Sequence, residues 1–441
     1  MSLKPPESVR KLRETLHAKA KGNPGYRFYS LYDKVYRNDI LHHAWQRCRA
    51  NGGAAGVDGQ SFEQIEAQGL ERWLEGLTEE LRIRTYRPQA LRRVWIAKEN
   101  GKQRPIGIPT IKDRVIQMAT VLVIEPIFEA DMPSEQYAYR SDRSALEAVD
   151  QAHWLLCQGY HQVVDADLSG YFDSIPHREL KKSLARRISD GAMLALIKMW
   201  LEMAVEETDE RGRKRRTTES RRTGRGTPQG SPISPLLANI YMRRFVLGWK
   251  LLGWEQRLEA RIVNFADDLV ILCRGPGQEA RKRMQERMER LRLCVNAEKT
   301  RVRRAPEEPF DFLGYTIGRC YKPQSGRAYI GTRPSRKRIR RVCLRIREMT
   351  GKQTRHLTAQ QMVEKLNPVL RGWANYFRLG SVSKAYRIVD AHARHRLRQW
   401  LCGKCKQRGA GTRRYPEVYL HQTLGLLRLQ ALTTSLPWAK A

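Results

Sequence analysis

Long apolar segments are missing from this chain of 441 residues. No run approaches the roughly 18 to 20 consecutive apolar residues that a membrane-spanning helix needs. Residues 1–20 carry charge without an apolar stretch, so we expect no secretory signal there. Internal repeats and low-complexity tracts are also absent, while 41% of the residues are hydrophobic. These features exclude a wholly disordered chain and predict a globular protein of about three domains.

Acidic residues are scarce, with 46 Asp and Glu against 82 Lys and Arg and a net charge of +36. Residues 319–441 hold 28 of the bases and only four acids, so this segment alone carries +24. Such an excess repels itself unless a polyanion neutralises it. The bases are not confined to one amphipathic helix, so nucleic acid is a stronger candidate partner than a membrane surface.

Cysteines are few and scattered, eight in all, which predicts free thiols in a reducing compartment. Cys402 and Cys405 form a CxxC pair, preceded by His392 and His395 in an HxxH pair. Two such pairs supply the ligand types of a zinc site. The alternative is an ordinary structural or surface role, because the intervening segment is short and the histidines fall in a basic helical stretch.

Hydrophobic periodicity predicts mostly helices in the first part of the chain, over residues 1–55, 62–84 and 113–130. Between the last two, residues 94–98 and 104–109 read as strands joined by a turn.

Two later segments are polar. Residues 205–225 suit a hairpin-like insert, in which Arg211 to Arg225 contain eight bases and one acid. That charge run is either a solvated face or a contact with nucleic acid. Residues 321–333 are rich in glycine and polar side chains with Pro323 near the start, which suits a domain junction followed by helices up to about residue 430.

The residues most typical of a chemical role are acids placed between apolar runs. Asp267 and Asp268 separate two β-rich segments and predict the tip of a hairpin. Asp167 ends a second apolar segment that leads through a turn into a helix. Adjacent carboxylates are costly to hold together without a cation, although an Asp-rich turn is also common. Oxygen ligands of this kind suit two Mg²⁺ ions that stabilise the attacking and leaving oxygens of a phosphoryl transfer.

Two other segments have features of a phosphate or nucleotide site. Residues 226–240 contain small residues and prolines that predict a tight turn before an apolar helix. Lys98 and Arg104 stand on the two arms of the expected 94–109 hairpin and could clamp triphosphate oxygens, or be plain surface bases.

Taken in order, these segments resemble the fingers and palm of reverse transcriptases, and more closely the bacterial group II intron-encoded reverse transcriptases, or maturases. The resemblance extends from about residue 25 to about residue 430. Its motifs are Gly56-Val57-Asp58-Gly59, Tyr86-Arg87-Pro88, Lys98 to Pro109, Asp167 to Asp173, Pro228-Gln229-Gly230, Phe265 to Asp268, Glu298-Lys299-Thr300, Phe312-Leu313-Gly314-Tyr315 and Arg371 to Phe377.

The resemblance implies an α/β right-hand polymerase followed by a helical thumb and maturase region. We expect an N-terminal helical extension and the start of the fingers in residues 1–85, fingers and palm in 86–320, and the helical basic region in 321–441. The implied activity is RNA-directed DNA synthesis, which adds dNTPs to a DNA primer on an RNA template, together with binding of the intron RNA for splicing and mobility. Asp167, Asp267 and Asp268 would then be the catalytic ligands of two Mg²⁺ ions.

The same resemblance assigns roles around the nucleotide. Lys98 and Arg104 would contact the incoming triphosphate, and Gln229 would lie against the nucleotide. Phe172 matches the bulky residue that excludes a ribose 2′-hydroxyl, and Lys299 would contact the nucleotide or the primer. The chain departs from the family pattern at the start of the hairpin tip, where Phe replaces the commoner Tyr, and in the second fingers block, Tyr137 to Arg140.

The basic region after residue 318 is the expected RNA surface. Trp373 and Phe377 are four residues apart, so they are either core residues of a helix or stacking partners for bases. The cations that we assign to this surface are Arg336, Arg340, Arg341, Arg371 and Arg378.

Two alternatives stay open: a related reverse transcriptase that serves phage defence or spacer acquisition, and a mainly RNA-binding splicing factor. The intact acids favour an enzyme over the latter, and the motif around Trp373 favours the intron-linked function over the former. Because the chain has no His-Asn-His cluster and no paired CxxC motifs, we expect no endonuclease activity. We also expect a bacterial cytoplasmic location.

Overall fold

The computed structural model describes residues 3–97, 101, 103–209, 211–322, 325–407 and 409–435. The chain begins with helices that pack around one buried helix. That central helix, α5, is apolar on all sides and buried along nearly its whole length, as expected of a helix inside a core. The helices of this part are α1 (Glu7–Gly22), α2 (Tyr32–Val35), α3 (Asn38–Asn51), α4 (Phe62–Arg82) and α5 (Ile111–Glu129).

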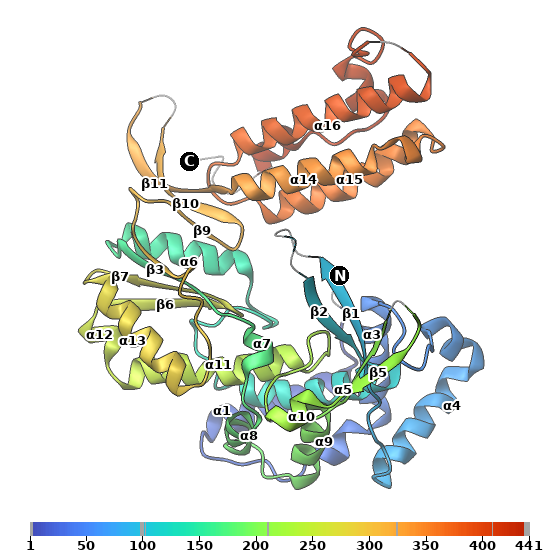
Figure 1. The fold of residues 1–441 in the computed structure, drawn as a ribbon, viewed down its shortest axis with the longest axis vertical. Coiled ribbons are helices and arrows are strands. Elements are labelled where there is room, and N and C mark those ends of the chain that lie inside the picture. Colours follow the sequence, from blue (N-terminus) through green and yellow to red (C-terminus); the bar gives the residue numbers. More distant parts are fainter. Residues whose placement is uncertain are drawn as a thin grey trace.

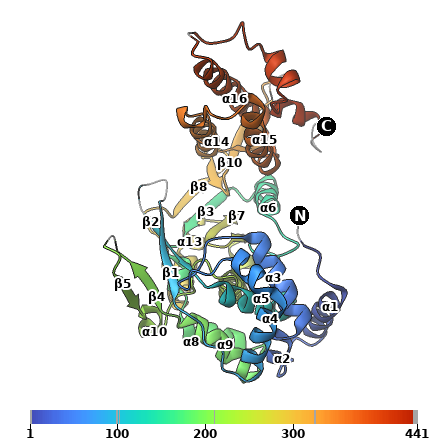
Figure 2. The ribbon, with the colours of Figure 1, turned by 90° about the vertical axis from the view of Figure 1, so that its right-hand side faces the viewer.

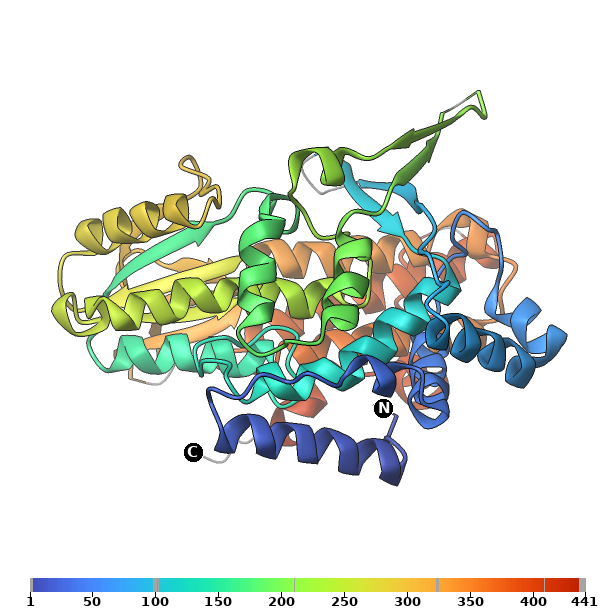
Figure 3. The ribbon, with the colours of Figure 1, turned by 90° about the horizontal axis from the view of Figure 1, so that it is seen from below.

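A four-stranded sheet of order β2-β1-β4-β5 lies beside these helices. Its first hairpin is antiparallel with Arg92 opposite Ile108 and Ala97 opposite Gln103, and its second is the predicted polar insert, which projects away from the body (Figure 3). Both predicted hairpins are therefore confirmed. The strands are β1 (Leu91–Ala97), β2 (Gln103–Ile108), β4 (Val205–Thr208) and β5 (Lys214–Thr217).

The second sheet, of order β6-β7-β3-β8, is the palm. Its strands pair antiparallel, and β7 is buried over all but its first residue. Helix α6 (Ala145–Cys157) covers one side of the sheet and α13 (Gly277–Arg290) the other (Figure 1). The strands are β3 (Gln162–Asp167), β6 (Ala260–Phe265), β7 (Asp268–Cys273) and β8 (Arg301–Arg304).

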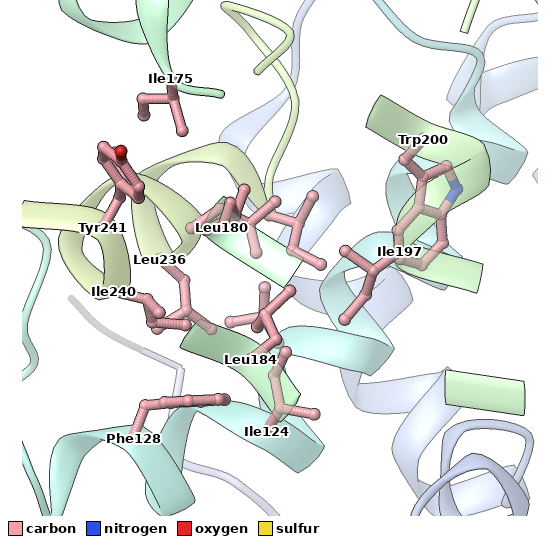
Figure 4. Close-up of a cluster of buried hydrophobic side chains, with 14 of the residues drawn as sticks. Ile124, Phe128, Ile175, Leu180, Leu184, Ile197, Trp200, Leu236, Ile240 and Tyr241 are labelled. Atoms are coloured by element: carbon pink, nitrogen blue, oxygen red, sulfur yellow. The ribbon is translucent and has the colours of Figure 1, made fainter. Parts of the chain in front are cut away.

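Helices below the palm sheet join it to the N-terminal helices. Apolar side chains from α5, α8, α9 and α11 meet there in the main core (Figure 4). The helices of this region are α7 (Tyr171–Ser174), α8 (His177–Ala185), α9 (Gly191–Leu201), α10 (Glu219–Thr223), α11 (Ser234–Leu251) and α12 (Trp254–Arg257). The labelled core residues of Figure 4 are Ile124, Phe128, Ile175, Leu180, Leu184, Ile197, Trp200, Leu236, Ile240 and Tyr241.

The C-terminal part begins with a small sheet of order β11-β10-β9, followed by three helices stacked above the palm (Figure 2). These helices share a separate apolar core. The elements are β9 (Phe310–Phe312), β10 (Tyr315–Tyr321), β11 (Ala328–Pro334), α14 (Arg336–Met349), α15 (Ala359–Tyr376) and α16 (Ser383–Lys404), with short helical turns at Lys352–Thr354, Tyr419–Thr423 and Leu429–Ser435.

Part of the predicted domain junction at residues 321–333 forms strand β11. β11 pairs with β10 along its whole length, from Tyr315 opposite Pro334 to Tyr321 opposite Ala328. The composition of the segment does not indicate a strand, because the strand character of β11 comes from pairing with β10. The helical region starts at Arg336, where the Ser335 hydroxyl caps α14.

A third cluster of buried side chains links the palm to the C-terminal part, and we call it the joint cluster. It contains Val163 of β3 and Val270 of β7 together with Tyr315 of β10 and Phe377 and Leu379 after α15. The Tyr376 hydroxyl donates to the Leu313 carbonyl at 2.8 Å, and the Tyr315 hydroxyl donates to the Tyr376 carbonyl. No helix in the described part of the chain is long and apolar enough to cross a membrane.

Candidate active site and nucleic-acid interface

The predicted acids meet at one end of the palm sheet. Asp167 is the last residue of β3 and Asp268 the first of β7, and the two are directly opposite each other in the ladder. Asp267 precedes Asp268 in the β6–β7 turn, which Ala266 enters with a φ of 57°. The strand-end and hairpin-tip placement expected from the sequence is confirmed, and three carboxylates from two distant segments are gathered there.

This crowding of negative charge changes the acidity of the site. Solvent reaches Asp268 at the strand end, yet protein atoms crowd its carboxyl. Burial and the charges of Asp267 and Asp167 together raise the pKa of Asp268 to about 7. Burial also raises the pKa of Asp165, one pleat before Asp167, to about 6, against the opposing charge of Arg303. Like-charge crowding of this kind is relieved by a bound cation.

Lys299 binds one of these acids. Its Nζ lies 2.9 Å from Oδ2 of Asp167, and the side-chain amide of Asn296 donates to the same oxygen at 3.3 Å. The Asn296 backbone N–H also donates to the Asp167 carbonyl at 2.8 Å, which fixes the Lys299 segment against the end of β3. Within the described residues no three acid, histidine or cysteine side chains form a ready-made metal cage. Asp167 is instead neutralised by an amine.

A pocket of about 690 Å³ adjoins the acids and brings together Arg104, Phe172 and Gln229. Gln229 is held from both sides: its Oε1 accepts from Arg104 Nε at 2.8 Å and its Nε2 donates to Asp173 at 2.7 Å. Phe172 is buried on α7, in edge contact with Tyr139 at 6.4 Å between ring centroids. The acids themselves do not line this pocket, and Lys98 lies outside the described residues.

The turn that carries Gln229 depends on a close backbone approach. The Gly107 N–H of β2 donates to the Gln229 carbonyl at 2.8 Å, and the Thr227 N–H donates to the Phe172 carbonyl at 2.7 Å. At Gly230, φ is 112° and a Cβ would lie 2.6 Å from the Gly107 carbonyl oxygen. Only glycine fits this position, so the turn is locked simultaneously to β2 and to α7.

The sequence did not predict a role for several residues that lie at the site. Tyr139 lines the pocket, where burial and the Asp267 charge raise its pKa while the Arg104 charge lowers it. Arg338, from the first turn of α14, is near enough to lower the pKa of Asp268. Asn296 and Asp173 position Lys299 and Gln229. No sequence pattern marks Asn296 or Arg338, since their partners are remote in the chain, whereas Asp173 and Tyr139 stand in motifs that the resemblance had already identified.

The basic C-terminal surface is largely as expected. Helix α14 carries seven bases and one acid, and its N-terminus faces the palm. Trp373 and Phe377 stack at 5.0 Å between centroids and pack in the joint cluster, so they are core residues. All five cations assigned to the RNA surface are exposed, namely Arg336, Arg340, Arg341, Arg371 and Arg378.

The possible zinc ligands do not converge. His392 Nε2 contacts the Cys343 carbonyl at 2.9 Å, Cys402 is buried, and the Cys405 thiol accepts from the Tyr415 hydroxyl at 3.6 Å. Among residues that the structure describes, no group that could hold a metal is found at these positions. Their contacts are those of ordinary structural residues.

The polar insert is partly neutralised by its own acids. Lys214 and Arg216 of β5 both pair with Glu206 on the opposite strand, at 3.1 and 2.7 Å. Arg213 pairs with Asp209 at 2.8 Å. The insert therefore offers less positive charge to a ligand than its sequence indicates.

A palm sheet with three acids at its tip, a fingers hairpin over a nucleotide-sized pocket and a helical thumb define a right-hand polymerase. The family model described as reverse transcriptase (RNA-dependent DNA polymerase) matches residues 96–317, and that of the group II intron maturase-specific domain matches residues 339–416. The chain belongs to the reverse transcriptase family and carries a maturase domain. The predicted family, fold and enzyme class are confirmed, as are a nucleic-acid partner and a general dependence on divalent metal.

Two relatives extend the comparison. Protein YkfC of Escherichia coli is 29% identical over 366 residues, which cover 75% of this chain and 93% of YkfC. Group II intron-encoded protein LtrA of Lactococcus lactis is 33% identical over 233 residues, which cover 51% of this chain but only 36% of LtrA. The chain thus matches nearly all of the first relative and about a third of the second.

Proposed function

We propose that this chain copies RNA into DNA by adding dNTPs to a primer at the Asp167, Asp267 and Asp268 site, with two Mg²⁺ ions as cofactor. The observation that supports this most strongly is the direct cross-strand pairing of Asp167 with Asp268, beside the pocket of Arg104 and Gln229. Carboxylate oxygens are the ligands that Mg²⁺ prefers, and the raised pKa of Asp268 is what an adjacent divalent cation would reverse.

The chemistry divides between the metal and the side chains. When bound, two ions supply activation of the primer 3′-hydroxyl and charge stabilisation on the leaving phosphate. Arg104, pre-oriented by Gln229, binds the triphosphate, and buried Phe172 excludes a 2′-hydroxyl from the sugar position. Lys299 neutralises Asp167 here, and it would be available to the nucleotide or the primer if a cation held that carboxylate instead. Lys98, which lies outside the described residues, stays the second predicted triphosphate contact.

The substitution Asp267→Asn tests the assignment. Removing one charge from the site should abolish dNTP incorporation on an RNA template while RNA affinity stays near that of the wild type. Asp142→Asn is the matched control, because Asp142 is an exposed acid that is not among the three assigned ligands. Primer extension by Asp267→Asn at the rate of the control would overturn the proposal.

We also propose that residues 321–441 bind intron RNA and support splicing and mobility, next to an N-terminal extension in residues 1–85 and fingers and palm in 86–320. The support is the maturase-domain match together with the exposed bases of α14. Eight free cysteines suit a reducing bacterial cytoplasm. The match over residues 339–416 also favours an intron RNA over the phage-defence alternative.

Charge reversal on α14 tests this surface. Replacing its three assigned cations by Glu should weaken intron RNA binding and flatten the salt slope by roughly 0.7 to 0.9 per lost phosphate contact. Single-nucleotide addition at saturating template should largely survive. The comparison variant reverses three exposed bases of the insert region. If the salt slope of RNA binding changes in this variant but not in the α14 variant, the RNA surface lies on the insert and not on α14. The two sets are Arg336, Arg340 and Arg341, and Arg215, Arg221 and Arg222.

A further inference from the structure

A second pocket lies below the palm, remote from the acids. It has a volume of about 620 Å³ and is bounded by α8, α11, α13 and the segment near Pro24. Helices α8 and α11 are on the side of the palm opposite to α14–α16 (Figure 1) and on the face seen in Figure 3. None of the residues assigned above to dNTP or intron RNA binding lines it.

The lining of this pocket is strongly cationic. Of the bases, Arg187 and Arg243 are engaged with Asp131, at 3.1 and 3.8 Å, and Arg244 pairs with Glu179 at 3.2 Å. Asp131 is the one acid among the lining residues of the described chain. The six lining bases are Lys182, Arg186, Arg187, Arg243, Arg244 and Arg287.

Two of these guanidinium groups have unused donors. Arg186 lines the pocket and is exposed, and its side chain makes no hydrogen bond or ion pair among the contacts of the described residues. Arg287 lies across α11 at Gly248, where its Nη2 donates to the Arg244 carbonyl at 3.1 Å, and its buried Nε has no acceptor in the part of the chain that the structure describes. Burial and neighbouring cations also lower the pKa of Arg243 and Arg287. The crowding of like charges and the unpaired guanidinium of Arg186 both fit an anion.

The remaining wall is apolar. Leu251 at the end of α11 is 85% exposed, and Leu247, one turn earlier, lines the same pocket with Ile240 and Phe128. A phosphate ion alone would make no favourable contact with the apolar side chain of Leu251. A ligand with a flat apolar face and an attached phosphate uses both parts of the lining, and the volume is in the range of small-ligand pockets.

We propose that this pocket holds an unpaired nucleotide of a bound RNA, with its phosphate on Arg186 and Arg287 and its base against Leu247 and Leu251. The site gives the palm a second contact with RNA, on the opposite side from the α14 surface. Because it requires an extruded base, it selects single-stranded or bulged RNA over a continuous duplex. It does not depend on polymerisation, so Asp267→Asn should retain it.

The proposal is tested with Arg186→Glu and Leu251→Ser, and with Arg178→Glu as the matched control. Arg178 is an exposed base on the same helix α8 that does not line the pocket. The probe is a 4-thiouridine-substituted single-stranded RNA, cross-linked to the full chain and mapped by mass spectrometry. We expect cross-links to α11 around Leu247 in the wild type and the control, and their loss in both pocket variants.

Affinity and competition complete the test. Arg186→Glu should weaken single-stranded RNA binding several-fold and reduce the salt slope by about 0.7, while dNTP addition to a duplex-bound primer is unchanged. AMP should compete for the cross-link better than inorganic phosphate. Cross-links or affinities of Arg186→Glu equal to those of Arg178→Glu would overturn the proposal, and equal competition by phosphate and AMP would refute the base contact.

Discussion

Replacement of Gly230 by alanine tests whether the Pro-Gln-Gly turn positions the nucleotide pocket. The turn is fixed to β2 through the Gln229 carbonyl, and a Cβ at Gly230 would approach the Gly107 carbonyl oxygen to 2.6 Å. Backbone at φ 112° costs an L-residue about 1 to 3 kcal/mol, and overpacking against the β2 backbone adds about 1 to 3 kcal/mol. The steric contact with the Gly107 carbonyl oxygen is relieved only if the turn moves away from β2.

Such a movement carries Gln229 with it and breaks its bridge between Arg104 and Asp173. A misplacement of about 1 Å at a positioning group costs on the order of 10²-fold in rate, equivalent to about 2.7 kcal/mol. We therefore expect kcat/KM for dNTP incorporation in Gly230→Ala to fall about 100-fold, with RNA affinity retained.

Gly224→Ala is the control for this experiment. Gly224 also has a positive φ, of 64°, but no atom lies within 4 Å of its Cβ position. The substitution should therefore cost only the backbone preference, about 1 to 2 kcal/mol of stability, without loss of activity. Single-turnover incorporation measured with both variants decides the question: a Gly230→Ala enzyme within about twofold of Gly224→Ala would refute the reasoning.

Three further outcomes are expected. Phe172→Val opens the buried space beside Tyr139 and should admit rNTPs more readily, as parallel rNTP and dNTP incorporation assays would show; an unchanged preference would remove Phe172 from the sugar site. Asp190 accepts the N–H groups of Leu31, Tyr32 and Met193, so Asp190→Ala should lower the unfolding free energy by about 3 to 5 kcal/mol in urea denaturation. Burial lowers the pKa of His177 below its ordinary value of 6.5, so as the pH falls the unfolded chain binds a proton at this imidazole before the folded chain does, and stability is lost below pH 6.5. His177→Gln should therefore flatten this part of the profile of urea midpoint against pH, and an unaltered profile would contradict the assignment.

The parts of the molecule that could be predicted from sequence are those whose signal is local. The β1–β2 and β6–β7 hairpins follow from apolar alternation around a turn, and the position of Asp167 at a strand end follows from the same pattern. The family motifs then assigned a role to each acid. Neither argument needs knowledge of which distant segments meet.

Contacts between distant segments were not predictable. The ion pair of Lys299 with Asp167 joins residues that are 132 positions apart in the sequence, and Arg338 reaches Asp268 from a different domain. Strand β11 was not predicted within the junction segment, because its pairing with β10, and not its composition, makes it a strand. The basic pocket below the palm is likewise assembled from segments whose bases read in sequence as ordinary helix surface.

The joint cluster has a consequence for how such polymerases can be recombined. Palm strands β3 and β7 share one apolar core with Tyr315, Phe377 and Leu379. The palm and the thumb therefore cannot be exchanged separately between relatives without disrupting this core. A chimaera joined at residue 320 would pair half of a hairpin from one parent with half from another, and a junction after β11 would still separate Phe377 from its palm partners. Exchange between relatives should succeed only where the crossover lies beyond Leu379, within the last helices, or where the whole cluster is transferred together.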